Sequence, residues 1–212
     1  MMLFVADVHI RPDHAEDVHK FMRWVKTVLA RGHRIYILGD LFDYWYTGIE
    51  KGLPGLMDTL TSQNIFILPG NRDFLLRNMV SQGLNILREE EIMSAPSGEK
   101  ILLAHGHTLT ENDMGFRVLH SLGWPILTLL DRIVSAQLKN RLARFLVSSS
   151  AVIRPPHATI LPEIADSRGV ARVICGHLHR LSMGERLIVL PAFCDTGAWL
   201  VWDKQGIRME SV

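Results

Sequence analysis

Residue types that bind metals follow a series of short apolar runs in this sequence. Each run is three or four residues long and is followed directly by glycine, by a polar residue, or by both. The motifs that follow the runs are Asp7-Val8-His9, Gly39-Asp40, Gly70-Asn71, His105-Gly106-His107 and Gly176-His177-Leu178-His179. Imidazole nitrogens with carboxylate and amide oxygens suit divalent ions such as Mn, Fe, Zn or Mg. The sequence therefore predicts a metal site, and seven donor residues are about right for two ions.

The spacing of residues within the motifs indicates that their side chains can reach the same metal ion. On extended chain, D-x-H and H-x-H place two side chains on the same side, and glycine beside a donor lets the backbone come close. Each motif alone has a plainer interpretation. A single histidine at a strand end is more often an ordinary hydrogen-bonded residue, and Asp40 can equally cap a helix. The five motifs together favour the metal site.

The apolar runs predict the scaffold. Runs this short, apolar at every position, are typical of strands covered on both faces. Helical patterns lie between several of them, at 15–30 and at about 53–62. This alternation predicts an α/β (α+β) layered fold, in which ligands bind beyond the carboxyl ends of the strands. The last apolar runs are expected to form two or three antiparallel strands, at 186–190, 198–202 and 207–210.

The segment 112–168 differs from the rest of the chain. Apolar residues recur there at helical spacing, and Gly123 and Pro125 predict a break between two helices. Between positions 114 and 156, six basic residues stand against one acidic residue. We predict a helical, lid-like insertion at 112–168 within a single domain of residues 1–212. Its basic face is either an ordinary solvated surface or a contact with lipid headgroups.

The composition limits the class of protein. The chain has 212 residues, a net charge of +1 and two cysteines, which argues against a dominant nucleic-acid surface and a disulfide framework. Its first apolar stretch ends at Asp7 and is too short for a signal peptide. The longest apolar region is far below the roughly 20 residues of a membrane span. We therefore expect a cytoplasmic protein that is soluble or peripheral.

The five motifs, in this order, resemble the calcineurin-like metallophosphoesterases, whose pattern is D-x-H, G-D-x-x-D, G-N-H-[DE], H-G-[HD] and G-H-x-H. The match runs from residue 3 to about 180. It implies a two-sheet β-sandwich flanked by helices, with two divalent metal ions. The ligands it implies are Asp7, His9 and His179 for one ion, Asn71, His105 and His177 for the other, and Asp40 as the bridge. Asp43 and Asp73, the last residues of the second and third motifs, are expected to orient ligands or backbone.

Arg72 departs from the family pattern. Most of the family has histidine there, and that histidine is thought to protonate an alkoxide leaving group or to stabilise the transition state. Arginine cannot act as an acid, but its guanidinium offers a fork to phosphate oxygens. A phosphate monoester leaves without needing a proton, since its second pKa is about 6. Arg72 therefore favours pyrophosphate cleavage, with Asp40, Asn71 and His105 as the other catalytic candidates.

Within the family, residues 39–45, 70–74 and 105–109 are similar to members that hydrolyse UDP-2,3-diacylglucosamine to UMP and 2,3-diacylglucosamine 1-phosphate. The similarity implies Mn2+, a role in lipid A biosynthesis, a UDP-linked acylated sugar as substrate, and contact with the cytoplasmic face of the inner membrane. The substrate-binding residues it implies are Asn71, Arg72, Asp113, Phe116, Ser148, Ser149 and His177. Phe116 stands where those enzymes have tyrosine.

Other functions remain open at this point. The nearest alternative is a metallophosphoesterase that hydrolyses a soluble nucleotide or phosphodiester. A metal-poor scaffold that binds protein would show eroded ligands, and nucleases of this family keep histidine at the position of Arg72. His107 either touches the site or holds its loop, and the run 89–91 of glutamates is expected to be solvated. The aromatic residues 44–46 line a pocket or, as the favoured interpretation, pack in the core.

Overall fold

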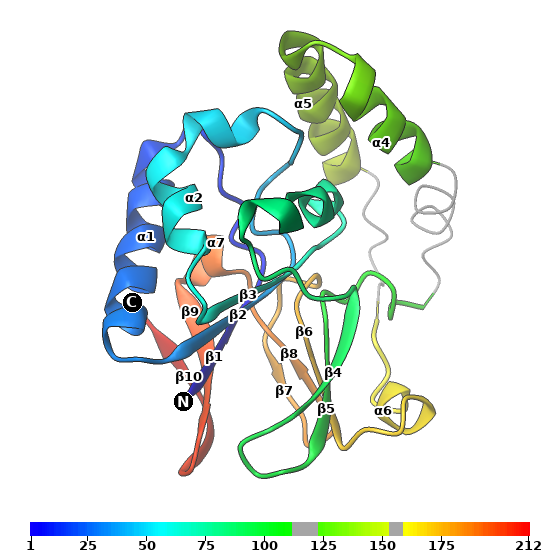
Figure 1. Cartoon of the computed structure of the whole chain (residues 1–212). Coiled ribbons are helices and arrows are strands. Elements are labelled where there is room, and N and C mark those ends of the chain that lie inside the picture. The colour runs from blue at the N-terminus through cyan, green and yellow to red at the C-terminus, as the bar shows by residue number, and fades with distance from the viewer. Residues whose placement is uncertain (112–122, 153–158) are drawn as a thin grey trace.

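The computed structural model describes residues 1–111, 123–152 and 159–212, and the strands in these ranges form two five-stranded sheets (Figure 1). The strands of the first sheet, in spatial order, are β10 (Gly206–Ser211), β9 (Ala198–Asp203), β1 (Met2–Val5), β2 (Arg34–Leu38) and β3 (Ile65–Leu68). Those of the second are β4 (Glu90–Ser94), β5 (Lys100–Ala104), β6 (Arg172–Cys175), β8 (Leu187–Val189) and β7 (Ser182–Met183). The predicted β-sandwich of the α/β (α+β) class is confirmed.

Alternate residues of β1 face two different layers of the core. Leu3 and Val5 pack with the helices outside the first sheet. Met2 and Phe4 pack between the two sheets, in a cluster that includes Leu103 of β5. A further cluster on the far side of the second sheet contains residues of β5, β6 and β8. Burial on both faces is the reason that these strands are apolar at every position.

Helix α1 (Ala15–Ala30) covers the first sheet because one of its faces is apolar. Its buried residues recur at helical spacing and are Val18, Phe21, Trp24, Val25 and Val28. Glu16 and Asp17 stand in its first turn, where acidic side chains complement the helix dipole. The neighbouring elements are η1 (Ile49–Gly52), α2 (Pro54–Leu60) and the 3-10 segment η2 (Phe74–Gln82), while the short helices α6 (Ile164–Ser167) and α7 (Phe193–Thr196) lie later in the chain.

The prediction for the end of the chain is right in one part and wrong in another. β9 and β10 are antiparallel, as expected. β8, however, belongs to the second sheet and runs parallel to β6. The glutamate run 89–91, expected to be solvated, is half-buried, and Glu90 begins the edge strand β4, which pairs antiparallel with β5. An edge strand tolerates charged residues, so its sequence lacks the apolar signal of the buried strands.

Two helices form a hairpin that rises above the sheets in the view of Figure 1. They are α4 (Trp124–Ile133) and α5 (Ala136–Val152), which we call the lid hairpin. Trp124, at the start of α4, stacks on Phe74 with ring centroids 4.3 Å apart. Further along the chain, Ile160 and Ala165 pack against the second sheet. In the described ranges, no helix combines the length and the apolar character that a membrane crossing requires.

Candidate metal centre

The motif glycines are required because donor side chains occupy the space beside them. A Cβ atom on Gly70 would lie 2.1 Å from Oδ1 of Asp40, and one on Gly39 would lie 2.4 Å from Nδ1 of His105. Gly39 also has a φ of +83°, which residues with a side chain rarely adopt. The strands thus deliver two donor side chains into contact with the glycines of neighbouring loops.

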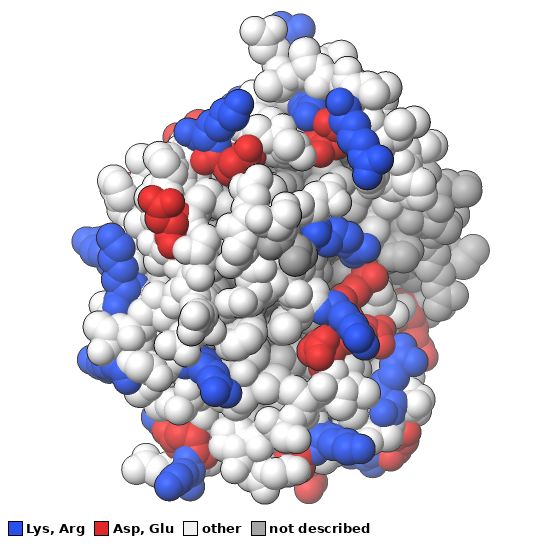
Figure 2. Space-filling view, viewed as in Figure 1, with Lys and Arg blue, Asp and Glu red and all other residues white. Residues whose placement is uncertain are grey.

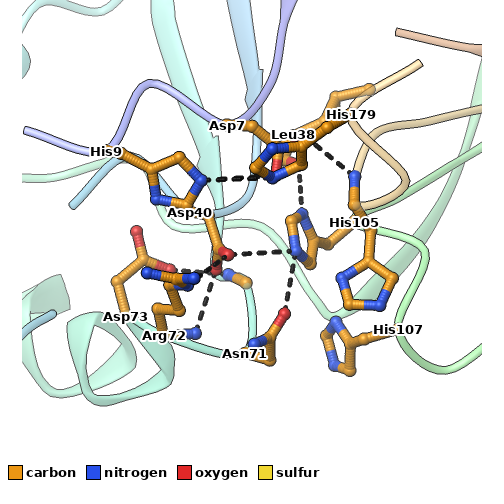
Figure 3. A network of polar contacts seen from close by, with 12 residues as sticks. Asp7, His9, Leu38, Asp40, Asn71, Arg72, Asp73, His105, His107 and His179 are labelled. Carbon is orange, nitrogen blue, oxygen red and sulfur yellow. Dashed lines mark hydrogen bonds and ion pairs between the residues drawn. The ribbon is translucent and has the colours of Figure 1, made fainter. Parts of the chain in front are cut away.

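Asp7, His9 and His179 converge as one group of donors (Figure 3). Oδ1 of Asp7 lies 3.2 Å from Nε2 of His179 and 3.8 Å from Nε2 of His9. The two Nε2 atoms are 3.3 Å apart. This Asp7 oxygen is buried, and it makes no hydrogen bond within the described residues. One carboxylate and two imidazoles around a common point fit a divalent cation.

A second group contains Asp40 and His105. Nδ1 of His105 lies 2.9 Å from the carbonyl oxygen of Leu38, and that oxygen can only accept, so Nδ1 carries a proton. Nε2 then faces Oδ1 of Asn71 at 3.0 Å and Oδ2 of Asp40 at 3.5 Å. In a neutral imidazole, Nε2 is an acceptor facing two acceptors. A cation between them resolves this conflict, and so does a second proton.

The pKa values of this second group follow from burial and mutual attraction. Burial would raise the pKa of Asp40, but the imidazole of His105, together with His9 and Arg72, lowers it below its usual value. Burial would likewise lower the pKa of His105, but Asp40 and Asp7 raise it to about 9. A cation bound by Nε2 must displace this proton, so metal binding to the second group releases a proton.

His177 lies beside the second group. Its ring centroid is 5.0 Å from that of His105, and its backbone N–H donates to Oδ2 of Asp7. Burial, and then the neighbouring imidazoles of His105 and His107, lower its pKa to about 3. A neutral imidazole is the form that binds a cation. Close clustering of donor atoms also joins Asp7 to Asp40 and His105, so Asp7 belongs to both groups. The role of Asp40 as the bridge, which the family resemblance implies, stays a prediction.

At five of the seven predicted ligands the backbone is left-handed, not extended; Asn71 and His105 are the exceptions. The φ angles are +54° at Asp7, +54° at His9, +49° at Asp40, +70° at His177 and +52° at His179. Within the described residues, these are the non-glycine positions with positive φ. The expectation that D-x-H and H-x-H lie on extended chain is therefore wrong, because left-handed turns, not the pleat of a strand, bring these side chains together. Such conformations cost on the order of 1 kcal/mol or more each, and they concentrate at functional sites.

Arg72 and Asp73 lie in the same loop and have different roles. The backbone N–H of Arg72 donates to Oδ1 of Asp40 at 2.9 Å, and its guanidinium donates to Asp43. Asp73 is buried and accepts from the backbone N–H groups of Gly70 and Phe42 at 2.7 and 3.2 Å. Burial and the nearby Asp40 raise the pKa of Asp73 to about 7. The geometry places Asp73 as a brace of the loop.

His107 points to Glu89, which sequence reasoning had placed in solvent. Nε2 of His107 lies 2.7 Å from Oε1 of Glu89, and the His107 side chain is almost completely buried. Burial lowers the pKa of His107, although Glu89 opposes the shift. Only a contact across the fold reveals this pair, since eighteen positions separate its members.

An apolar cavity opens beside the metal centre, between the core and the lid hairpin. Its empty volume is about 880 Å³, part of which is open to solvent. Asn71 and Arg72 line its metal end, and Tyr44, Trp45 and Trp124 contribute aromatic wall. Tyr44 and Trp45 are also buried in the main core cluster, so these aromatic residues both line a pocket and pack in the core.

The side chains of four predicted substrate-binding residues lie outside the part of the chain that the structure describes. Asp113 and Phe116 lie outside the described residues. Ser148 and Ser149 belong to α5, but their side chains are outside the described part of the chain.

The fold and the clustered donors define a phosphoesterase, and the chain belongs to the calcineurin-like phosphoesterase family, whose profile matches residues 2–181. It is 27% identical to the UDP-2,3-diacylglucosamine hydrolase of Edwardsiella ictaluri (strain 93-146), over 98% of this chain and 90% of the relative. It is 28% identical to the enzyme of the same name from Pseudomonas savastanoi pv. phaseolicola (strain 1448A / Race 6), over 100% and 95%.

Solved structures of low similarity also match. The Zn2+ complex of Vps29 from Entamoeba histolytica is 14% identical and has a TM-score of 0.42, covering 100% of this chain and 97% of that one. This similarity is too low to support an argument about function. Family membership identifies the chain as a metal-dependent hydrolase that uses divalent ions, and the Asp and His groups described above supply candidate ligands.

Proposed function

We propose that this protein hydrolyses the pyrophosphate bond of UDP-2,3-diacylglucosamine and releases UMP and 2,3-diacylglucosamine 1-phosphate. The observation that carries the proposal is the apolar cavity whose metal end is lined by Asn71 and Arg72. A substrate with a phosphoanhydride and acyl chains matches this combination of a charged end and an apolar wall. The relatives that share most of its length bear the name of this hydrolase.

The metal ligands form part of the proposal. Asp7, His9 and His179 would hold one ion, Asn71, His105 and His177 the other, and Asp40 would lie between them. These residues would hold two divalent ions, which we take to be Mn2+, and the ions would supply positive charge for the phosphate oxygens and an activated water. The protein holds the donors rigidly, because the Leu38 carbonyl fixes the ring of His105 and Asp73, held by two N–H groups, braces the loop that carries Asn71.

Arg72 would bind the phosphoanhydride. Its guanidinium is held near the donor groups, with Nε 3.7 Å from Oδ2 of Asp40. A fixed guanidinium can donate two parallel hydrogen bonds to phosphate oxygens and stabilise negative charge as it develops. It cannot protonate the leaving group, which suits a leaving phosphate monoester. Asp113, Phe116, Ser148 and Ser149 are the further substrate contacts that the family resemblance suggests.

The lid hairpin would receive the acyl chains and meet the membrane. We take 1–212 as one domain with a lid-like insertion at 112–168, which contains the lid hairpin and, at its end, residues such as Ile160 and Ala165 that pack against the second sheet. Three apolar side chains of α4, spaced at helical intervals, are more than half exposed: Ile126, Leu129 and Ile133. Exposed basic residues, Arg132 and Arg141, lie on the same hairpin. Apolar side chains flanked by basic ones suit the cytoplasmic surface of a membrane with anionic lipids.

Charge elsewhere on the molecule is mixed. On the face drawn in Figure 2, the described acidic and basic side chains are interspersed, in keeping with the net charge of +1.

Sedimentation with vesicles of neutral and of anionic lipid tests the membrane contact of the lid hairpin. We expect binding to anionic vesicles that weakens with salt and is lost in the variant Ile126→Ser/Leu129→Ser/Ile133→Ser. Equal binding of this variant would contradict the assignment.

The decisive test of function is product release by the purified protein. The protein is freed of metal, reloaded with Mn2+ and incubated with UDP-2,3-diacylglucosamine in detergent micelles, and UMP is quantified. We expect UMP from the wild-type protein and none from Asp40→Ala. Hydrolysis of soluble dinucleotides or aryl diesters, without UMP from the lipid substrate, would instead indicate a soluble phosphodiester as the substrate.

A further inference from the structure

A buried ion pair interrupts the apolar wall of the cavity. Asp131 of α4 is 7% exposed, and its Oδ1 lies 3.2 Å from Nζ of Lys139 on α5. Thr47, an exposed residue in the turn that follows residues 44–46, completes the contact, because its backbone N–H and its hydroxyl donate to the two carboxylate oxygens at 2.9 and 2.6 Å. Nζ of Lys139 donates in turn to the carbonyl oxygen of Thr47 at 3.2 Å. Both carboxylate oxygens therefore have partners.

The same pair also lines a second hollow. That hollow opens on the other side of the pair and is bordered by Thr47, Asn78 and Arg132, together with Asp131 and Lys139. Asp131 and Lys139 face both spaces, whereas Arg132 and Asn78 border the second hollow and are not part of the cavity wall. The Asp131–Lys139 pair is thus a partition between the cavity and the second hollow.

The partition lies away from the Trp124 end of the cavity. Trp124 begins α4, and its ring centroid is 5.8 Å from that of His107, which follows the ligand loop. Asp131 is seven positions further along the same helix, and seven residues of α-helix span roughly 10 Å. A chain that enters at the metal end and runs along α4 therefore covers apolar wall first and meets the charged pair afterwards.

An alkyl chain gains affinity only while it covers apolar wall. Each methylene transferred from water to an apolar surface gains free energy. Nζ of Lys139 has three hydrogens and contacts two acceptors, Asp131 and the carbonyl of Thr47, so a methylene pressed against it covers a donor without making a hydrogen bond. A buried ion pair is also seldom more stable than apolar residues of similar volume, so stability alone does not account for charge at this place. We propose that the Asp131–Lys139 partition sets the maximum length of the acyl chain that the site accepts; for the acyl nature of the ligand, this inference rests on the proposed function.

The test measures binding as a function of chain length. A series of n-alkyl phosphates from 8 to 18 carbons is titrated into the Mn2+-loaded protein, with the fluorescence of Trp45 and Trp124 in the cavity wall as the signal. For wild type, we expect affinity to rise about fourfold for each methylene up to a limiting length and then to level off. In Asp131→Ala/Lys139→Ala, the rise should continue for at least two further methylenes.

Two further variants separate the partition from a merely structural role. Asn78→Ala alters the second hollow and not the cavity wall, and it should keep the wild-type limit. In Asp131→Asn/Lys139→Ala, the asparagine side chain can still hydrogen-bond to Thr47 and so keep the lid attached. This variant replaces the double alanine variant if the latter does not fold, and it should show the longer limit. A uniform loss of affinity at all lengths with an unchanged limit would mean that the pair only fastens the lid, and this would overturn the proposal.

The measurement does not depend on hydrolysis of the lipid substrate. A limit that shifts in the variants, in a protein that releases no UMP, would refute the proposed substrate and leave the partition intact. Conversely, UMP release with an unchanged limit would refute the partition alone. An affinity that does not change with chain length in wild type would also overturn it.

Discussion

The guanidinium of Arg72 donates a hydrogen bond to the carboxylate of Asp43. The same Asp43 oxygen lies 3.5 Å from Nδ1 of His9. Burial would raise the pKa of Asp43, but the contacts with His9 and Arg72 lower it, so the group is ionised at neutral pH. One carboxylate thus orients both a candidate phosphate contact and a candidate metal ligand.

Replacement of Asp43 by Asn should weaken both functions. We expect kcat to fall roughly 10- to 100-fold, because residues that orient metal ligands have effects of this size. The affinity for Mn2+ should also decrease, since the neutral amide removes the negative charge 3.5 Å from Nδ1 of His9. Steady-state kinetics and Mn2+ titration of the variant measure the two effects. Asp58→Asn, on the exposed surface of α2, is the control, and an equal loss there would argue against a specific role of Asp43.

The substitution Arg72→His should change the choice of reaction. Histidine restores a group that can give a proton to an alkoxide, but it removes the fork that binds phosphate oxygens. We expect the rate of pyrophosphate cleavage to fall by about 100-fold, with a smaller loss or a gain for alkyl phosphodiesters. The measurement is the ratio of kcat/KM for the two substrate types. An unchanged ratio would show that Arg72 does not determine the leaving group.

Glycine at position 179 should stabilise the metal-free protein relative to alanine. The backbone at His179 has a φ of +52°, where alanine is strained and glycine is not. Measured in EDTA, His179→Gly should be more stable than His179→Ala by about 1 kcal/mol, or roughly 2–4 °C in Tm. The same pair of substitutions at Lys26, on the exposed face of α1, should show the opposite order. Equal stability of the His179→Gly and His179→Ala variants would contradict backbone strain at position 179.

The buried pair of His107 and Glu89 should contribute to folding. We expect a coupling free energy of about 1–3 kcal/mol from a double-mutant cycle with His107→Ala and Glu89→Ala, because each single change removes the 2.7 Å contact between the buried imidazole and the carboxylate. Urea unfolding of the four proteins supplies the measurement. Glu91→Ala is the control, since Glu91 forms no ion pair within the described part of the chain. If the two single changes lower the free energy of unfolding additively, the His107–Glu89 contact does not contribute to folding.

The sequence predicted the strands of the core and the donor residues at their ends. Both follow from local patterns, since strands such as β1 and β2 are apolar on two faces and the motifs stand next to them. The left-handed backbone at Asp7 and His9 could not be predicted, because the sign of φ at a residue with a side chain leaves no trace in periodicity. Contacts between distant segments were also missed, such as Thr47 with Asp131, which lie 84 positions apart.

The left-handed ligand backbones also bear on how variants of this protein should be selected. A screen that scores only expression, solubility or thermal resistance would reward glycine at position 179, since the backbone there favours it. The same applies at His9 and His177. Such a screen would rank glycine above alanine at each of these positions, and it would not register the loss of a donor side chain. Selection for robustness therefore has to include a measurement of bound metal, or it will select against the centre itself.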